Sequence, residues 1–141
     1  MIDISLDEAP RLLVIEDGPV EALVIEEAGK QAGYEIMQVS DLDGAELAAI
    51  VFKPTVITLD LGFSAAEGDE PSRYGDEGLA FLELLAENGC DARIIIISGK
   101  SRRKRELARL QGVGLQLKVV GHLTKPFNLR DLAEVLTKLA A

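Results

Sequence analysis

Five short hydrophobic runs alternate with five segments of helical character, and this order constrains the fold more than any other feature of the sequence. Three of the runs are almost continuously apolar and rich in Val, Ile and Leu, which is typical of parallel strands covered on both faces. Strict alternation of strands and helices with short connections indicates a parallel sheet with helices on both sides. The predicted strands span residues 11–15, 35–39, 55–59, 93–97 and 118–123.

Residues that start and stop helices mark the segments between these runs. Pro19 suits a first helical position, Gly33 and Gly89 suit the position just past a helix end, and Asn128 is a good N-cap. The predicted helices span residues 19–32, 42–52, 78–88, 101–112 and 129–139. With right-handed crossovers, five strands and five helices give an α/β fold, a flavodoxin-like doubly wound parallel sheet with strand order 2-1-3-4-5.

Length and composition limit the class of protein. The chain has 141 residues, 48% of them hydrophobic, which is enough for one domain with its own core. Residues 1–10 carry three acids and no basic residue and are interpreted as a lead-in to a domain at 11–141. No apolar stretch is long enough for a membrane span, and the net charge of −9 makes direct DNA binding an unfavourable hypothesis. The single cysteine, Cys90, excludes an internal disulfide and predicts a cytoplasmic protein.

Polar and ionisable residues follow the apolar runs where the predicted strands end. Glu16 and Asp17 follow the first run, Asp60 ends the stretch VITLD, and Ser98 and Lys125 follow the fourth and fifth runs. Each of these residues taken alone is commonly a turn, a cap or a surface side chain. The carboxyl ends of parallel strands meet at one edge of a sheet, where ligands bind in open α/β folds. The sequence therefore predicts one site at that edge.

The residue types predict the chemistry of this site. Three carboxylates cannot crowd together without a cation, and hard oxygen ligands suit Mg²⁺. A lysine and a hydroxyl beside them suit the oxygens of a phosphoryl group. A carboxylate can itself be a nucleophile and form an aspartyl phosphate.

Four spaced motifs in the expected order give the chain its resemblance to the receiver domains of two-component response regulators. The matching pieces are LLVIEDGPVEALVIEEAGKQAGYEI, ITLDLG with DEGLAFLELL, IIIISGKS and HLTKPF, and the likeness runs from about residue 10 to 139. The approach to the fifth strand, with VVG before KPF, is also similar to receivers linked to EAL-type cyclic-di-GMP phosphodiesterases. This chain contains no EAL segment.

The resemblance implies a role for each residue around the metal. Asp60 falls on the phosphoacceptor. Asp17 falls on a direct ligand of Mg²⁺ and Glu16 on a ligand that acts through water. The backbone carbonyl of Gly62 falls on the third protein ligand.

The resemblance also implies a switch around the phosphoryl group. Ser98 falls on the hydroxyl residue that turns toward this group, and Lys125 falls on the lysine that pairs with it. Pro126 follows in a bond that is usually cis. His122 stands where the family has an aromatic switch residue and is expected to be half-buried. The implied donor is a histidine kinase or histidine phosphotransfer protein, and the implied output surface, for an output domain or protein partner, is the fourth helix and fifth strand.

Two charged segments depart from the family pattern. An acidic insertion at residues 63–77 follows the phosphoacceptor and can supplement the metal site, gate it, or be a solvated loop. A basic block of Lys100 and residues 102–105 either pairs with this insertion or docks an acidic partner.

Three alternative functions share parts of this residue pattern. A pseudo-receiver that binds partners without phosphorylation is the main alternative, and the altered loop favours it. A haloacid-dehalogenase-type phosphatase requires a second aspartate at position 62, which is glycine here. A flavodoxin requires a hydroxyl-rich loop, but Gly18 and Pro19 follow the first strand. We therefore expect a phosphoacceptor that is not a turnover enzyme on a separate substrate.

Overall fold

A computed structural model describes residues 9–60, 77–99 and 111–140 of the chain. Its five strands pair in parallel in the order β2-β1-β3-β4-β5, as predicted. The strands are β1 (Arg11–Ile15), β2 (Glu35–Val39), β3 (Val56–Asp60), β4 (Arg93–Ser98) and β5 (Lys118–Thr124). The described residues include the helices α1 (Pro19–Gln31), α2 (Leu42–Val51), α3 (Glu77–Glu87) and α5 (Leu129–Ala140).

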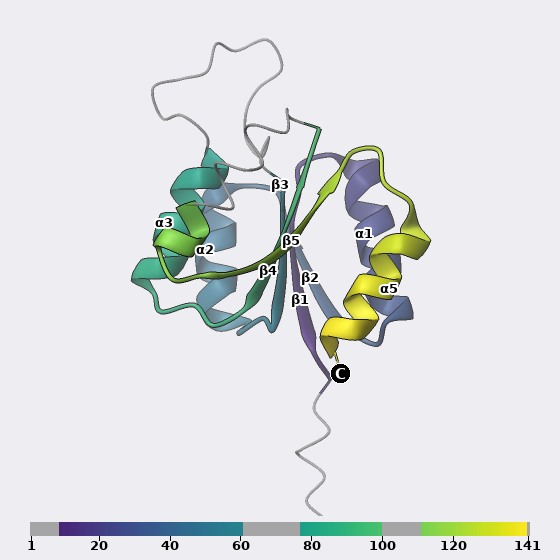
Figure 1. Cartoon of the computed structure of the whole chain (residues 1–141), viewed down its shortest axis with the longest axis horizontal. Helices are drawn as coiled ribbons and strands as arrows, with labels where there is room; N and C mark the ends of the chain where they lie inside the picture. Colours follow the sequence, from purple (N-terminus) through teal and green to yellow (C-terminus); the bar gives the residue numbers. More distant parts are fainter. Residues whose placement is uncertain (1–8, 61–76, 100–110, 141) are drawn as a thin grey trace, which may run out of the picture.

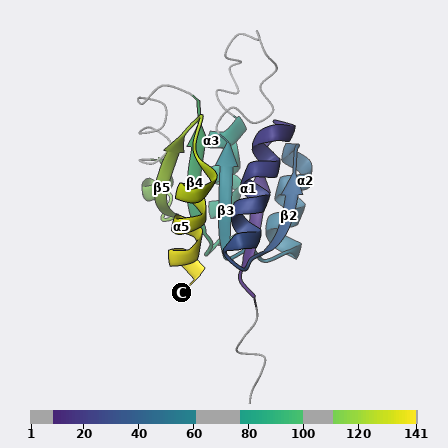
Figure 2. The same cartoon turned by 90° about the vertical axis from the view of Figure 1, so that its right-hand side faces the viewer.

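The molecule has three layers, with the sheet between two pairs of helices. Figure 1 views the sheet edge-on, with α2 and α3 on one face and α1 and α5 on the other. Figure 2 looks onto the face that α1 and α5 cover. Each face has its own core, one centred on Phe81, Leu82 and Leu85 of α3 and the other on Ile25 of α1 with Leu132 and Leu136 of α5.

The central strands are buried on both faces, which confirms the reading of the continuous apolar runs. Successive residues of a strand point to opposite faces, so both faces need apolar side chains. All five residues of β3 are buried, including its terminal Asp60, and only Arg11 of β1 is partly exposed. Strand β2 at the sheet edge is mostly exposed.

A β-bulge in β5 reverses which face of the sheet its side chains point to along the strand. Val119 pairs with Ile94, but Gly121 pairs with Ile95, so Val120 is an extra residue on this strand. Val119 packs against the α2–α3 core, whereas Leu123 packs against the α1–α5 core. Without the bulge, residues four apart would face the same side. The bulge thus places Val119 and Leu123 on opposite faces of the sheet.

The helix ends follow the predicted signals. Pro19 opens α1, and Gly33 and Gly89 have φ of 89° and 67° just past α1 and α3. The Asn128 side chain accepts from the N–H of Asp131 at 3.2 Å. The sequence reasoning missed the N-cap of α2, where the Asp41 carboxylate accepts from the N–H of Gly44 at 2.6 Å.

Several sequence interpretations concern residues outside the described ranges. They include most of the lead-in, the acidic insertion up to residue 76, and the basic block with most of the fourth predicted helix. Residues 111–114 are helical, so the helix continues two residues past the predicted end at residue 112. Among the helices of the described residues, none is both long and apolar enough to cross a membrane.

Candidate functional site

The carboxyl ends of β1, β3, β4 and β5 bring the predicted site residues to one edge of the sheet. Glu16 follows β1 directly, Asp60 is the last residue of β3, and Lys125 follows β5. Ser98 ends β4 beside Thr124. The register of the strands thus places together residues that are more than 100 positions apart in the chain.

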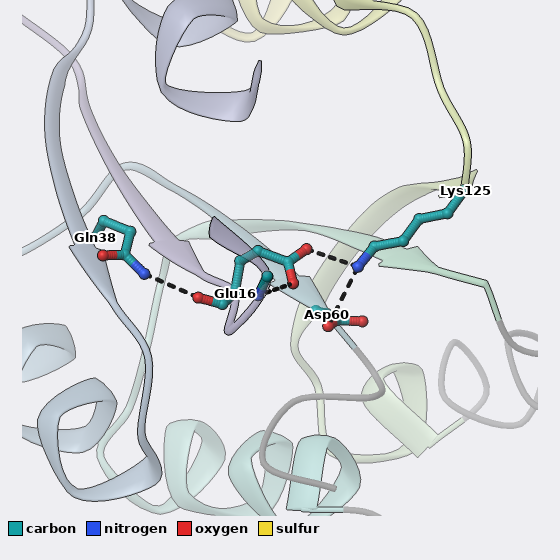
Figure 3. A network of polar contacts seen from close by, with 5 residues as sticks. Glu16, Gln38, Asp60 and Lys125 are labelled. Atoms are coloured by element: carbon teal, nitrogen blue, oxygen red, sulfur yellow. Dashed lines mark hydrogen bonds and ion pairs between the residues drawn. The ribbon is translucent and has the colours of Figure 1, made fainter. Parts of the chain in front are cut away.

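Lys125 links two buried carboxylates. Its Nζ lies 2.8 Å from Oε1 of Glu16 and 3.4 Å from Oδ2 of Asp60, as Figure 3 shows. Glu16 is 1% exposed and Asp60 5% exposed, while the Lys125 side chain is 22% exposed. Buried carboxylates are costly unless they are paired. A single ammonium group therefore serves two buried negative charges.

Backbone and side-chain contacts fix the position of Glu16. The N–H of Gly18 donates to Oε2 of Glu16 at 3.0 Å. The backbone of Glu16 extends the pairing of β1, since its N–H donates to the carbonyl of Val39 at 3.2 Å. Gln38 Nε2 donates to the carbonyl of Glu16 at 2.8 Å. Gln38 was not predicted as a site residue, because its role depends on the β1–β2 register and no motif marks it.

The described part of the site has more negative than positive charge, because the carboxylates of Glu16, Asp17 and Asp60 share the single ammonium group of Lys125. Burial raises the pKa of Glu16 from 4.5 to about 7, although Lys125 and the N–H of Gly18 act in the opposite direction. Burial acts to lower the pKa of Lys125, but its contacts with Glu16 and Asp60 outweigh this, and the pKa of Lys125 is raised. The lysine is thus held in its charged form, and the site retains an excess of acidic groups.

The acidic cluster has the ligands that a hard divalent cation prefers. One carboxylate oxygen from each of Glu16, Asp17 and Asp60 lies within 4.8 Å of the others. Oε1 of Glu16 is buried, and its ionic partner is the Lys125 ammonium 2.8 Å away. Oxygen ligands with this charge fit Mg²⁺, which keeps part of its water shell. Asp17 is exposed and can reach solvent and metal at once.

The remaining predicted site residues divide into three groups. The Lys125–Pro126 peptide bond is cis. Gly62 and the side chain of Ser98 lie outside what the structure describes. His122 lies opposite Ile96 on β5 and its side chain is exposed. The expectation of a half-buried histidine was wrong: β5 is an edge strand on which His122 is exposed, while its neighbour Leu123 packs against the α1–α5 core.

Comparisons with known proteins support the fold, and they do not test the individual site residues. No family model matches the chain. An alkaline phosphatase synthesis transcriptional regulatory protein, SphR from Synechococcus elongatus, is 27% identical over 133 residues, which cover 88% of this chain and 46% of that protein. This chain thus spans about half the length of the curated relative that it matches.

Solved structures give the same fold over nearly the whole chain. A CheY-like response regulator receiver domain protein from Methanospirillum hungatei superposes with a TM-score of 0.73 at 17% identity, covering 94% of each chain. A response regulator from Colwellia psychrerythraea gives 0.73 at 21% identity, covering 94% of this chain and 98% of the other. One from Thermotoga maritima gives 0.71 at 18% identity, with the same coverage. The chain therefore has the fold of response regulator receiver domains.

Proposed function

We propose that this chain is a phosphoacceptor receiver domain in which Asp60 takes up a phosphoryl group with the help of Mg²⁺. The observation that carries the proposal is the Lys125 ammonium lying between the buried carboxylates of Glu16 and Asp60. A structural ion pair needs one carboxylate. The second carboxylate and the nearby Asp17 add negative charge that a bound cation would neutralise.

The transfer step is a displacement at phosphorus. An oxygen of Asp60 attacks the phosphorus of the donor, and the new P–O bond forms as the donor's bond to phosphorus breaks. With a phosphohistidine donor, the electron pair of the P–N bond stays on the imidazole, which takes up a proton. Glu16, Asp17 and Asp60 would hold Mg²⁺, which when bound would neutralise charge on the phosphoryl oxygens and on the carboxylates.

The residues of this chain have separate tasks in that step. Lys125 is charged, and because its ammonium already lies 3.4 Å from Oδ2 of Asp60, it is placed to pair with an oxygen of a phosphoryl group formed there. The N–H of Gly18 and the amide of Gln38 hold Glu16 in place while this happens. Ser98 ends the neighbouring strand and is the proposed hydroxyl partner of the phosphoryl group.

The phosphoryl group carries nearly two negative charges and replaces the single charge of the Asp60 carboxylate at the end of β3, which is the local event of the switch. We propose that a histidine kinase or histidine phosphotransfer protein in the cytoplasm is the donor. The proposed output is a protein-interaction surface formed by the fourth helix and β5, read by an output domain or a separate protein. The chain itself is proposed not to turn over a separate substrate.

The proposal is tested by intact mass after incubation with acetyl phosphate. We expect the wild type to gain one phosphoryl group in Mg²⁺ and none in excess chelator. Asp60→Asn should gain none, and Asp43→Asn, a matched change on the surface of α2, should behave as the wild type does. A wild type that stays unmodified with both acetyl phosphate and phosphorylated kinase partners would instead identify an interaction module that is not phosphorylated.

A further inference from the structure

The amino-terminal edge of the sheet, opposite the acidic site, carries a row of basic residues. Arg11, Arg93 and Lys118 are the first residues of β1, β4 and β5. Arg93 pairs directly with Lys118 in the β4–β5 register. Thr55 stands between the two arginines, because its N–H donates to the carbonyl of Arg11 at 2.8 Å and its carbonyl accepts from the N–H of Arg93 at 3.0 Å. Four adjacent strands therefore begin in a line that contains three cations.

A cavity of about 610 Å³ opens along this row. Its charged lining consists of four basic residues and one acid, in a chain whose net charge is −9. Like charges in neighbouring strand positions destabilise a sheet unless something compensates them. A volume of this size is in the range of small-molecule sites, roughly 300–1,000 Å³. The charged lining residues are Arg11, Lys53, Asp91, Arg93 and Lys118.

The two arginines are fixed in place by the ends of helices. Arg11 Nε donates to the carbonyls of Phe52 at 2.9 Å and Lys53 at 2.8 Å, just past the end of α2. Arg93 Nη1 donates to the carbonyl of Leu139 near the end of α5 at 2.9 Å. Helix carboxyl ends carry partial negative charge and favour such cations. These contacts account for the arginines as structural groups, and they also hold both guanidinium groups rigidly at the cavity.

For the two lysines that line the cavity, Lys53 and Lys118, the structure shows no comparable contact with a helix end among the described residues. Lys53 is exposed and has φ of 53°, a left-handed conformation that is unfavourable for a residue with a Cβ atom. Lys118 lies 2.5 Å from Asp91, but the two side chains are 54% and 87% exposed. An exposed pair of this kind contributes little to stability and exchanges readily with another anion. Both lysines can therefore turn to a ligand without breaking the fold.

The rest of the lining limits the kind of ligand. Burial raises the pKa of the Cys90 thiol, so this group stays neutral and adds no competing negative charge. No aromatic side chain lines the cavity among the described residues, so a nucleobase would find nothing to stack on. Cations on a fixed row suit the oxygens of phosphate groups.

We propose that this cavity binds a compact organic phosphate or polyphosphate that has no aromatic base. The site uses the side chains of Lys53 and Lys118 together with the fixed guanidinium groups of Arg11 and Arg93. It is at the opposite end of the strands from Asp60, about 17 Å away for a five-residue strand. The proposal is thus independent of the phosphoacceptor function.

The test uses pyrophosphate as the probe, at low ionic strength and without Mg²⁺, followed by heteronuclear NMR of the whole chain. We expect saturable shifts of Lys53, Cys90, Arg93 and Lys118. The double variant Lys53→Gln with Lys118→Gln should bind about tenfold or more weakly. Asp91→Asn should bind a few-fold more tightly, since it removes the competing carboxylate. Lys30→Gln, which removes an exposed charge from α1, is the matched control.

Each other outcome overturns the proposal. Shifts that do not saturate at millimolar pyrophosphate would show no site. An equal loss of affinity in Lys30→Gln would show attraction to overall charge alone. Weaker binding by Asp91→Asn would contradict the exchange of Asp91 for the ligand, and this variant changes only an exposed pair, so the fold is not at risk.

Discussion

Replacing Glu16 by glutamine should stabilise the metal-free protein, and only above the pH at which the carboxyl ionises. Glu16 is 1% exposed, and burial raises its pKa from 4.5 to about 7. A raised pKa means that the folded protein binds the proton more tightly than the unfolded chain does. The free energy of unfolding is then lost as pH rises from 4.5 through about 7. Glutamine imitates the neutral carboxyl and avoids this loss.

The size of the effect follows from the shift. Each pKa unit corresponds to about 1.4 kcal/mol, so the ionised Glu16 costs the folded state about 3 kcal/mol at pH 8.5 in the absence of metal. At pH 5 the difference between wild type and Glu16→Gln should be within about 1 kcal/mol. In Mg²⁺ the wild type should instead be more stable than Glu16→Gln. The metal binds the folded protein through its ionised carboxylates, and the variant has one carboxylate fewer to offer.

Urea unfolding followed by circular dichroism, from pH 5 to 8.5 in chelator, measures this difference. Glu83→Gln on the exposed face of α3 is the matched control and should show no such pH dependence. A difference between wild type and Glu16→Gln that is the same at every pH would refute the reasoning. So would a Glu16→Gln protein that is less stable than the wild type at pH 8.5 without metal.

Three further predictions concern the fold and are checked by the same unfolding assay. Thr58→Val should stabilise the protein by about 1–2 kcal/mol, because Oγ1 of Thr58 is buried with no hydrogen-bond partner among the described residues; an unchanged midpoint would contradict this. Gln116→Gly should stabilise it by about 0.5–1 kcal/mol, since Gln116 has φ of 65° where the chain leaves a helix, and a loss of stability would argue against strain there. Tyr34→Phe should cost about 1 kcal/mol at pH 7, because the Tyr34 hydroxyl donates to the Leu136 carbonyl at 2.7 Å. Burial raises the pKa of Tyr34 to about 12, so the wild type should lose stability as pH rises from 10 toward 12 in a way that the phenylalanine variant does not; parallel alkaline curves would contradict this.

The sheet could be predicted from the sequence because its signals are local. Continuous apolar runs, Pro19, and the glycines at 33 and 89 mark elements without reference to the rest of the chain. The bulge at Val120 could not be predicted. Val119 and Val120 are the same residue type, and only packing against β4 and the two cores decides which one is left outside. Asp41 could have been predicted as an N-cap, because it is an aspartate directly before an apolar helical segment, but it was not.

The sequence was enough to predict which residues meet at the site. It was not enough to predict which side chains form the ion pairs. Strand topology alone brings Glu16, Asp60 and Lys125 to one edge. That Lys125 approaches Glu16 more closely than Asp60 depends on side-chain conformations, which no motif encodes. The basic row at the other edge was visible as residues that begin three hydrophobic runs. Its alignment across the sheet appears only once the register is known.

The central claim is that Asp60 itself forms an acyl phosphate, and chemical trapping of that bond tests the claim most directly. The protein is incubated with acetyl phosphate and Mg²⁺, reduced with borohydride, and digested for peptide mass mapping. An acyl phosphate is reduced to the alcohol, so the account predicts homoserine at position 60, dependent on Mg²⁺ and absent without acetyl phosphate. Homoserine at another aspartate, or an unreduced Asp60 in a protein that has gained a phosphoryl group, would contradict it.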